Sequence, residues 1–257
     1  MKARTAVVAA ATAALCFAAV SCGPSGDDSS GGKDTARANS PSSAKPSGDD
    51  TSPPSPPPST LPATTGRVLT EAELTEAALA TGDVPDYEVT PLQGSQDTGT
   101  ERAENQACRP LAAVINGAPE PAATATVFRT VMDRSEEGKD DQTVVTEILT
   151  SHPKGGAQQV LRGVRDAVRA CAGGFRTSSD EGPSTYSKVE LLDAPRVGEE
   201  SIAYQVTGNI EGDKVPLVFQ LVRRGSTVVT FYVADFVDAT PPDLPAEVVT
   251  AQLAKLP

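Results

Sequence analysis

The sequence contains few of the residues from which catalytic and nucleic-acid-binding sites are usually built. Its 257 residues include no Trp, 4 Tyr, 6 Phe and a single His, and 34 acidic side chains outnumber 22 basic ones. The formal net charge of -12 excludes a nucleic-acid partner, because phosphate backbones are bound by clustered Lys and Arg. The same excess of acidic residues argues against binding to anionic lipid through a polybasic segment.

The N-terminus has an apolar stretch, but a short one. Ala6 to Val20 follows the basic residues Lys2 and Arg4, and its length of about 15 residues is too small for a permanent membrane-spanning helix. Basic residues followed by such a stretch are typical of export signals. We therefore expect residues 1–21 to be a signal peptide.

The end of that stretch, Ala19-Val20-Ser21-Cys22, resembles a bacterial lipobox, in which the Cys receives a diacylglyceryl lipid and fatty acids such as palmitate. The resemblance implies lipidation at Cys22 and a protein anchored at the extracytoplasmic face of the cell membrane. Ordinary secretory cleavage before Gly23, with Cys22 as an incidental thiol, is the alternative.

Residues 22–66 differ in composition from the rest of the chain. Gly, Ser, Pro and Thr predominate, and Leu61 is the one large apolar side chain after Cys22. Such a segment cannot bury enough apolar surface to offset its ordering entropy, so we expect a disordered tether. As a flexible coil it reaches roughly 35–40 Å, enough to carry a folded domain away from a membrane into a cell wall.

The remaining residues, 67–257, are long enough for one domain of about 190 residues. The pattern of apolar residues predicts helices over 70–81, 105–115, 155–172 and 245–256. It predicts strands over 124–133, 143–151, 186–192, 201–208, 216–223 and 227–235, the last few joined by tight turns. We expect an α+β fold, with a single antiparallel sheet of about five or six strands packed against helices.

Two cysteines remain in this domain, Cys108 and Cys171. An exported domain meets oxidising conditions, and an even pair favours a disulfide between them that ties two helices together. Two buried free thiols are the alternative.

Catalytic and metal-binding motifs are sparse. His152 has no Gly-x-Ser-x-Gly frame around it, and one His with two paired cysteines cannot make an ordinary zinc site. The stretch from Asp133 to Gly138 is similar to a calcium loop but has Val144 where the acidic twelfth residue belongs. Gly155-Gly156 is at most a weak anion site. We expect no catalytic residues, no cofactor and no metal.

Charged residues leave one enzymatic alternative open. A hydrolase using two carboxylates could draw on several acidic residues, although the scarcity of aromatic rings argues against a sugar site. The basic stripe of the long helix is interpreted as a solvated face. The acidic candidates are Glu71, Glu73, Glu76, Asp140, Asp141, Glu199 and Glu200, and the stripe is Arg162, Arg165 and Arg169.

Short motifs along the domain match those of one family. They are Leu69-Thr70-x-x-Glu73-Leu74-x-x-Ala77-x-Leu79, Gly82-Asp83-Val84-Pro85-x-Tyr87, Cys108, Arg169-Ala170-Cys171, Gly198-Glu199-Glu200-Ser201 and Arg223-Arg224-Gly225-Ser226. Together they are similar to the PknH-like extracellular domain, the sensor module of certain bacterial Ser/Thr kinases and of actinobacterial lipoproteins. The resemblance implies an antiparallel sheet with flanking helices and a cleft for a ligand. The sequence departs from the kinase sensor in having one cysteine pair instead of two.

These observations lead to a functional hypothesis. We expect a non-enzymatic, membrane-anchored lipoprotein whose domain binds a small ligand or an envelope protein, like a sensor. The alternative is a carrier of a lipid or another hydrophobic molecule between membrane and wall, which predicts a sizeable apolar cavity between helices and sheet. The hydrolase alternative predicts two acids with displaced pKa values in one cleft.

Overall fold

The computed structural model describes residues 66–92, 99–136, 144–193, 195–210, 212–234 and 240–257. All described residues belong to one compact unit, Pro58–Pro257. The predicted signal peptide, Cys22 and nearly all of the predicted tether lie outside the described residues, as do Asp140 and Asp141. Within the described ranges, no helix is long and apolar enough to cross a membrane.

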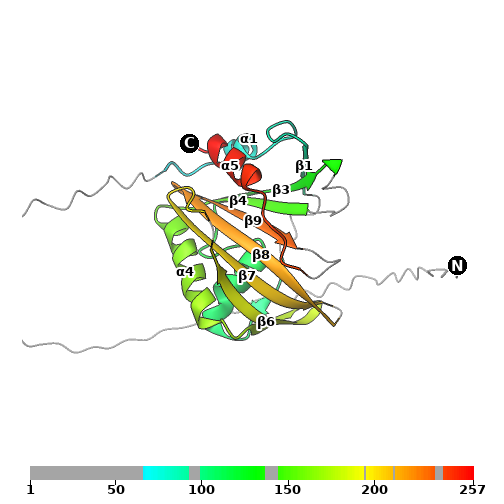
Figure 1. The fold of residues 1–257 in the computed structure, drawn as a ribbon. Helices are drawn as coiled ribbons and strands as arrows, with labels where there is room; N and C mark the ends of the chain where they lie inside the picture. The colour runs from blue at the N-terminus through cyan, green and yellow to red at the C-terminus, as the bar shows by residue number, and fades with distance from the viewer. Residues whose placement is uncertain (1–65, 93–98, 137–143, 194, 211, 235–239) are drawn as a thin grey trace, which may run out of the picture. The chain divides into compact units, whose positions relative to one another are not determined.

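A nine-stranded antiparallel sheet forms the centre of the domain, with the order β1-β3-β4-β9-β8-β7-β6-β5-β2 (Figure 1). Its strands are β1 (Tyr87–Pro91), β2 (Arg102–Ala103), β3 (Ala125–Asp133), β4 (Val144–Ser151), β5 (Phe175–Ser179), β6 (Gly182–Leu192), β7 (Glu200–Ile210), β8 (Asp213–Arg224) and β9 (Thr227–Ala234). Strands β6 to β9 follow one another along the chain as an antiparallel meander, and tight turns join β7 to β8 and β8 to β9.

Four α-helices within the described residues cover the sheet: α1 (Glu71–Ala77), α2 (Arg109–Ile115), α4 (Gly156–Ala170) and α5 (Ala246–Lys255). A 3-10 turn, η1 (Gln106–Cys108), leads into α2. The predicted capping box starts α1, where Thr70 and Glu73 satisfy each other's backbone N–H groups. An apolar stripe runs along α4 and is buried from Ala157 to Val168.

The predicted α+β fold with about five or six strands is wrong, since the domain is mostly sheet and has nine strands. The three additional strands are β1, β2 and β5. Strands β1 and β2 form the two edges of the sheet and are short, so neither carries a long apolar run. In β5, only Phe175 is a large apolar residue, and the buried partner that alternates with it is Thr177. The segment therefore has a polar composition, which predicts a loop.

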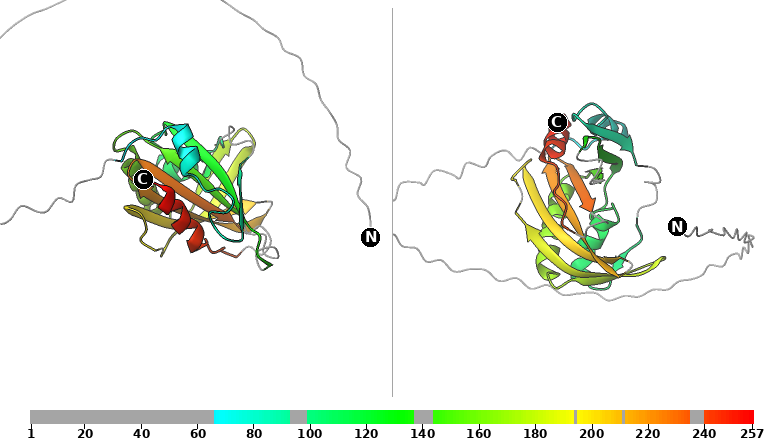
Figure 2. Two further views of the ribbon diagram at one scale, coloured as in Figure 1. Left: turned by 90° about the horizontal axis from the view of Figure 1, so that it is seen from above. Right: turned by 45° about the vertical axis from the view of Figure 1, so that its right-hand side comes forward.

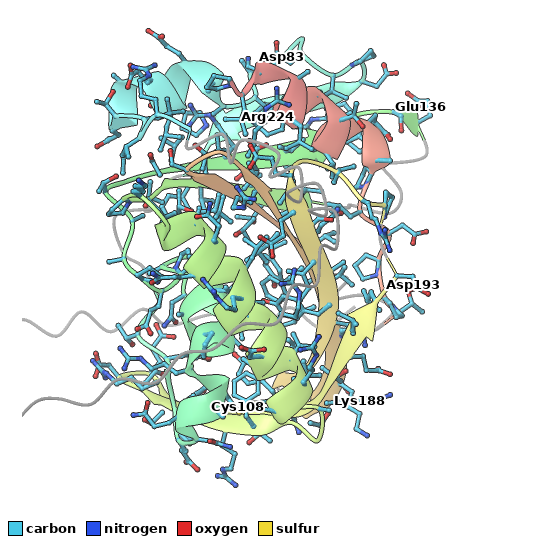
Figure 3. The ribbon with its side chains drawn as sticks, turned by 90° about the vertical axis from the view of Figure 1, so that its left-hand side faces the viewer. Asp83, Cys108, Glu136, Lys188, Asp193 and Arg224 are labelled. Carbon is cyan, nitrogen blue, oxygen red and sulfur yellow. A yellow bond between two sulfur atoms is a disulfide. The ribbon has the colours of Figure 1, made fainter. Side chains whose placement is uncertain are left out.

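One side of the sheet, here the α4 face, packs against α2 and α4. Its core includes Leu111, Val164 and Tyr204. The rings of Tyr204, Phe219 and Tyr232 stack in sequence, with centroids 5.3 Å and 4.9 Å apart. The disulfide between Cys108 and Cys171, which cysteine count predicts, is present and joins the start of α2 to the end of α4; Cys108 is labelled in Figure 3.

The other side of the sheet, here the α5 face, packs against α1 and α5, which lie together at one end of the domain (Figures 1 and 2). Its core includes Leu74, Phe231 and Val248. Because both faces of β8 are covered, every residue from Val215 to Val222 is buried, and the strand reads as a continuous run instead of an alternation.

Candidate functional site

Two surface cavities adjoin each other along the segment that follows α2. The first, cavity A, has a volume of about 540 Å³ and lies between α1, the end of β1 and β3. The second, cavity B, has about 530 Å³ and lies between β2, η1 and α2. Ala118 and Glu120 line both cavities. We call the pair of cavities the groove; each is within the size range of ordinary small-molecule sites.

The wall between the cavities is held against β3 by a glycine. Gly117 has a φ of 72°, a backbone conformation that favours glycine. A Cβ atom added there would lie 2.9 Å from the Phe128 ring, so the position also has no room for a side chain. The positive φ of Gly117 and its close approach to Phe128 together fix the positions of Ala118 and Glu120.

Asn116 connects this wall to the far side of cavity B. Its Oδ1 accepts the Glu101 backbone N–H at 3.1 Å, and its Nδ2 donates to the Glu101 carbonyl oxygen at 2.8 Å. Its own carbonyl oxygen accepts the Gly99 N–H at 3.1 Å. These three bonds use most of the hydrogen-bonding capacity of Asn116, which indicates that its role is to shape the groove.

The Glu101 carboxylate is positioned from the sheet. Ser184 Oγ donates to one of its oxygens at 2.7 Å and the Tyr186 hydroxyl donates to the other at 2.6 Å, both from β6. Burial of Tyr186 and its bond to Glu101 raise the pKa of the phenol, which therefore remains a donor. Glu101 is thus a fixed negative group lining cavity B.

Two arginines supply the positive charge of cavity B. Arg109 donates from Nε and Nη2 to a single oxygen of Glu120, at 2.9 Å and 2.6 Å. Arg102 is exposed on the edge strand β2 and has no ion-pair partner among the described residues. The groove therefore presents both signs of charge beside alanine and proline surfaces, which suits a small ligand with polar and apolar parts.

His152 lies outside this groove. It is fully buried, and Nε2 lies 3.0 Å from Thr150 Oγ1, itself buried. Desolvation lowers the pKa of the imidazole, so the ring is neutral and buried in the fold. A substrate cannot reach it, and the arrangement offers no exposed nucleophile beside the ring.

The acidic candidates that lie within the described residues are not brought together as a pair in one of these cavities. Glu71 lines cavity A, whereas Glu73 belongs to the cap of α1 and has its pKa lowered to about 2 by the bonds from Thr70. Burial raises the pKa of Glu147, but this residue lines none of cavities A, B or the third cavity described below.

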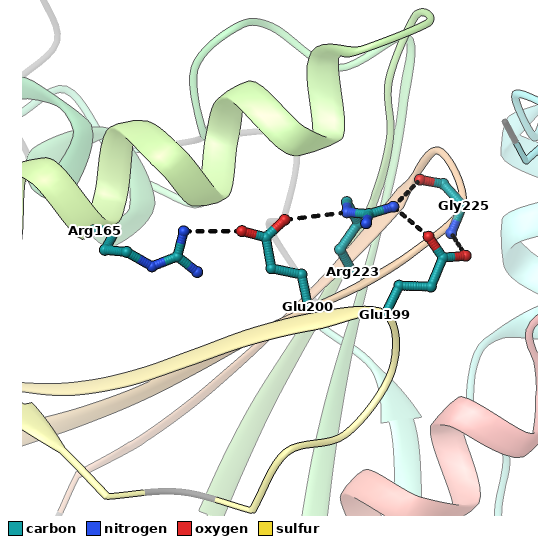
Figure 4. A network of polar contacts seen from close by, with 5 residues as sticks. All are labelled: Arg165, Glu199, Glu200, Arg223 and Gly225. Atoms are coloured by element: carbon teal, nitrogen blue, oxygen red, sulfur yellow. Dashed lines mark hydrogen bonds and ion pairs between the residues drawn. The ribbon is translucent and has the colours of Figure 1, made fainter. Parts of the chain in front are cut away.

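Of the three remaining candidates, Glu76 is exposed on α1, while Glu199 and Glu200 form an ion-pair network (Figure 4). Glu200 accepts from Arg165 at 2.8 Å and lies 3.4 Å from Arg223, which also pairs with Glu199. Arg165 is therefore part of a structural link between α4 and the sheet, and the predicted basic stripe is not a uniform solvated face.

Metal-binding groups do not gather within the described residues, where no three His, Cys, Asp or Glu side chains lie close enough to hold an ion. In the stretch similar to a calcium loop, Asp133 Oδ1 accepts the Ser135 N–H at 2.8 Å, and Gly138 lies outside the described residues.

Sequence reasoning missed the groove residues Glu101, Asn116 and Tyr186. The dipeptide Asn116-Gly117 was readable as the end of a helix. Nothing in the sequence shows that Glu101 accepts a hydrogen bond from Tyr186, which lies 85 positions further along the chain.

Fold and groove together define a disulfide-bonded, mostly-β domain with an open, mixed-polarity groove. No family model and no curated protein matches the sequence. Among solved structures, the chain is similar to "the extracellular domain of PknH from Mycobacterium tuberculosis", with a TM-score of 0.48 and 11% identity over 74% of this chain and 95% of that one.

Proposed function

We propose that the domain is a non-enzymatic, extracytoplasmic binding domain that takes a small ligand in the groove, in the manner of a sensor. The observation that carries the proposal is the pair of adjoining cavities sharing Ala118 and Glu120, with the Glu101 carboxylate and the Arg102 guanidinium in cavity B. The ligand is a small molecule with an anionic group for Arg102 and a donor for Glu101.

An extracytoplasmic location is supported by the disulfide between Cys108 and Cys171, because such bonds persist in oxidising compartments. The export signal and the lipobox-like Cys22 support the same location and a lipid anchor. Replacing Cys22 by Ala and fractionating the cells tests the anchor. We expect the variant to leave the membrane fraction, and its retention there would contradict lipidation at this residue.

The carrier alternative receives less support. It requires a large apolar space between helices and sheet, whereas α2 and α4 pack against the sheet through fully buried side chains such as Leu111, Leu161 and Tyr204. Cavities A and B open at the surface and carry charged side chains.

Native mass spectrometry of the full-length chain, exported by its own host and kept under native conditions, tests ligand binding. We expect a reproducible additional mass that is lost on denaturation. The matched variants are Ala118→Trp, which fills the groove, and Ala254→Trp, which places the same ring on an exposed position of α5.

The first variant should lose the additional mass and the second should keep it. A mass that persists in Ala118→Trp, or a clean unliganded mass for the unmodified chain, would contradict ligand binding in the groove.

A further inference from the structure

A third cavity, cavity C, lies on the α5 face of the sheet, away from the groove residues. Its volume is about 440 Å³. Strands β7 and β8 provide its floor through Gln205, Val218 and Gln220, while the end of β6 and the segment leading into α5 provide its walls. Asp193, at the end of β6, is labelled in Figure 3. Cavity C shares no lining residue with cavities A and B.

Gln220 is the unusual residue of this floor. Its side chain is buried, with 6% of its surface exposed, and it makes no hydrogen bond to the described part of the chain. The amide atoms are not among the fully buried unpaired atoms of the described residues, so they are in contact with the space of cavity C. The residues opposite Gln220 on the neighbouring strands, Ala203 and Phe231, have no polar side-chain atoms. Both polar ends of the amide are therefore left for an occupant of cavity C.

Gln205 supplies a second amide to the same floor. Gln205 on β7 lies opposite Val218 on β8. Val218 is two residues from Gln220 along β8 and points to the same face, so one small ligand can contact both glutamines. The Nε2 of Gln205 donates to Thr207 Oγ1 at 3.3 Å, so its amide oxygen is the end directed to other partners. The two glutamines therefore offer acceptor oxygens on the floor of cavity C, both beside the apolar Val218.

The charge around cavity C has one sign. Asp193 and Asp243 line it, and none of the lining residues described is a Lys or Arg. Acceptor oxygens below and carboxylates at the rim favour a cation that donates N–H groups. Leu192, Val218 and Leu244 line the same space and suit an alkyl body.

We propose that cavity C binds an ammonium group on an apolar chain, with the amide oxygens of Gln220 and Gln205 accepting its N–H groups and Asp193 and Asp243 balancing its charge. The site is independent of the ligand proposed for the groove. Such an ammonium is available from a free alkylamine or from a lysine side chain of a partner protein.

Calorimetric titration of the full-length chain distinguishes these sources and tests the site. The probes are butylammonium, the blocked lysine N-acetyl-lysine amide, and 1-butanol as an uncharged analogue. We expect at least one ammonium probe to bind and butanol not to bind. Binding of butylammonium alone identifies a free amine, and binding of the blocked lysine identifies a basic side chain. No binding of either ammonium probe, or equal binding of butanol, would overturn the proposal.

Two variant pairs assign the binding to cavity C. Gln220→Leu should weaken ammonium binding by about tenfold or more, as expected for the loss of a charge-assisted hydrogen bond, without lowering the melting temperature, because the amide has no partner to lose. Gln159→Leu, the same change on the exposed side of α4, is its control. Asp243→Asn should also weaken binding, with Asp180→Asn in the β5–β6 turn as control.

Unchanged affinity in Gln220→Leu would overturn the assignment. Ala118→Trp closes the groove and should leave ammonium binding intact, so failure of the groove and failure of cavity C are told apart.

Discussion

The two faces of the sheet are stabilised in different ways. On the α4 face, a 15-residue helix, a disulfide and a stack of three rings lie against the strands. On the α5 face, helices of 7 and 10 residues cover the strands, and this face buries charged or amide side chains from β4, β8 and α5: Glu147, Gln220 and Gln252.

The buried polar groups of the α5 face differ among themselves. Gln252 is fully paired, since it accepts the Leu79 N–H and donates to the Ala77 carbonyl oxygen, each at 2.9 Å, and so joins α5 to the end of α1. Neither carboxylate oxygen of Glu147 has a hydrogen-bond partner in the described part of the chain. The α4 face is therefore closed by a covalent link, whereas the α5 face buries a carboxyl group whose protonation depends on pH.

The largest expected effect comes from removing the covalent link of the α4 face. Replacing both Cys108 and Cys171 by Ala releases a loop with a sequence separation of 63. The free energy of unfolding should fall by about 4 kcal/mol, because the unfolded chain gains conformational freedom. Urea denaturation of the variant and of the unmodified chain under non-reducing conditions measures this loss. Equal unfolding midpoints would show that the disulfide does not stabilise the α4 face.

A second prediction concerns pH and the α5 face. Burial raises the pKa of Glu147 to about 8 from an ordinary value of 4.5, although the positive charge of Arg129 acts to lower it. The folded state therefore holds the proton more tightly than the unfolded state. Stability from this group is present in full below pH 4.5 and is lost as the pH rises toward about 8.

Glu147→Gln removes this titration. Its free energy of unfolding should match that of the unmodified chain at acidic pH and exceed it above pH 8 by on the order of 3 kcal/mol, since no charge then needs to be buried. Thermal unfolding from pH 4 to 9 measures the difference, with Glu76→Gln on the exposed side of α1 as the control. A pH profile identical to that of the unmodified chain would contradict the assignment.

The smallest effect is expected at the start of α1. Thr70→Ala removes the side chain that caps the helix, where Thr70 Oγ1 accepts the Glu73 N–H at 3.3 Å. Unfolding should become easier by about 1 kcal/mol. Thr75→Ala on the same helix, whose hydroxyl bonds only to the Glu71 carbonyl oxygen at 2.8 Å, is the matched control in the same denaturation experiment. A loss no larger than the control's would show that the cap is not needed to cover the α5 face.

Much of the fold was predictable from periodicity. The stripe of α4 and the runs of β3, β4 and β7 to β9 have the apolar patterns that their burial requires. Strands β1, β2 and β5 were not predictable because they are short or polar, and β1 and β2 are held by pairing with strands distant in sequence. Glu147 illustrates the same limit. A carboxylic acid is expected at a solvent-facing position, yet Glu147 lies between Val145 and Leu149 on one face of β4 and is buried with the core of the α5 face.

The candidate sites were less predictable than the fold. The groove combines β2, the end of α2 and strand β6 through Glu101, Asn116 and Tyr186, and no two of these form a sequence motif. Cavity C depends on Gln220, and only the pairing of β8 with β7 and β9 shows that the residues opposite it are apolar. Sites assembled from pairing partners leave no local signal in a single sequence.

Hydrogen–deuterium exchange tests the central claim, that the groove is the ligand site, most directly. The full-length chain would be compared with its co-purified ligand bound and after the ligand has been removed. We expect the backbone amides of segments 99–103 and 116–120, which line cavity B, to exchange more slowly when the ligand is bound. Protection confined to α4 or α5, with exchange in both groove segments unchanged, would contradict it.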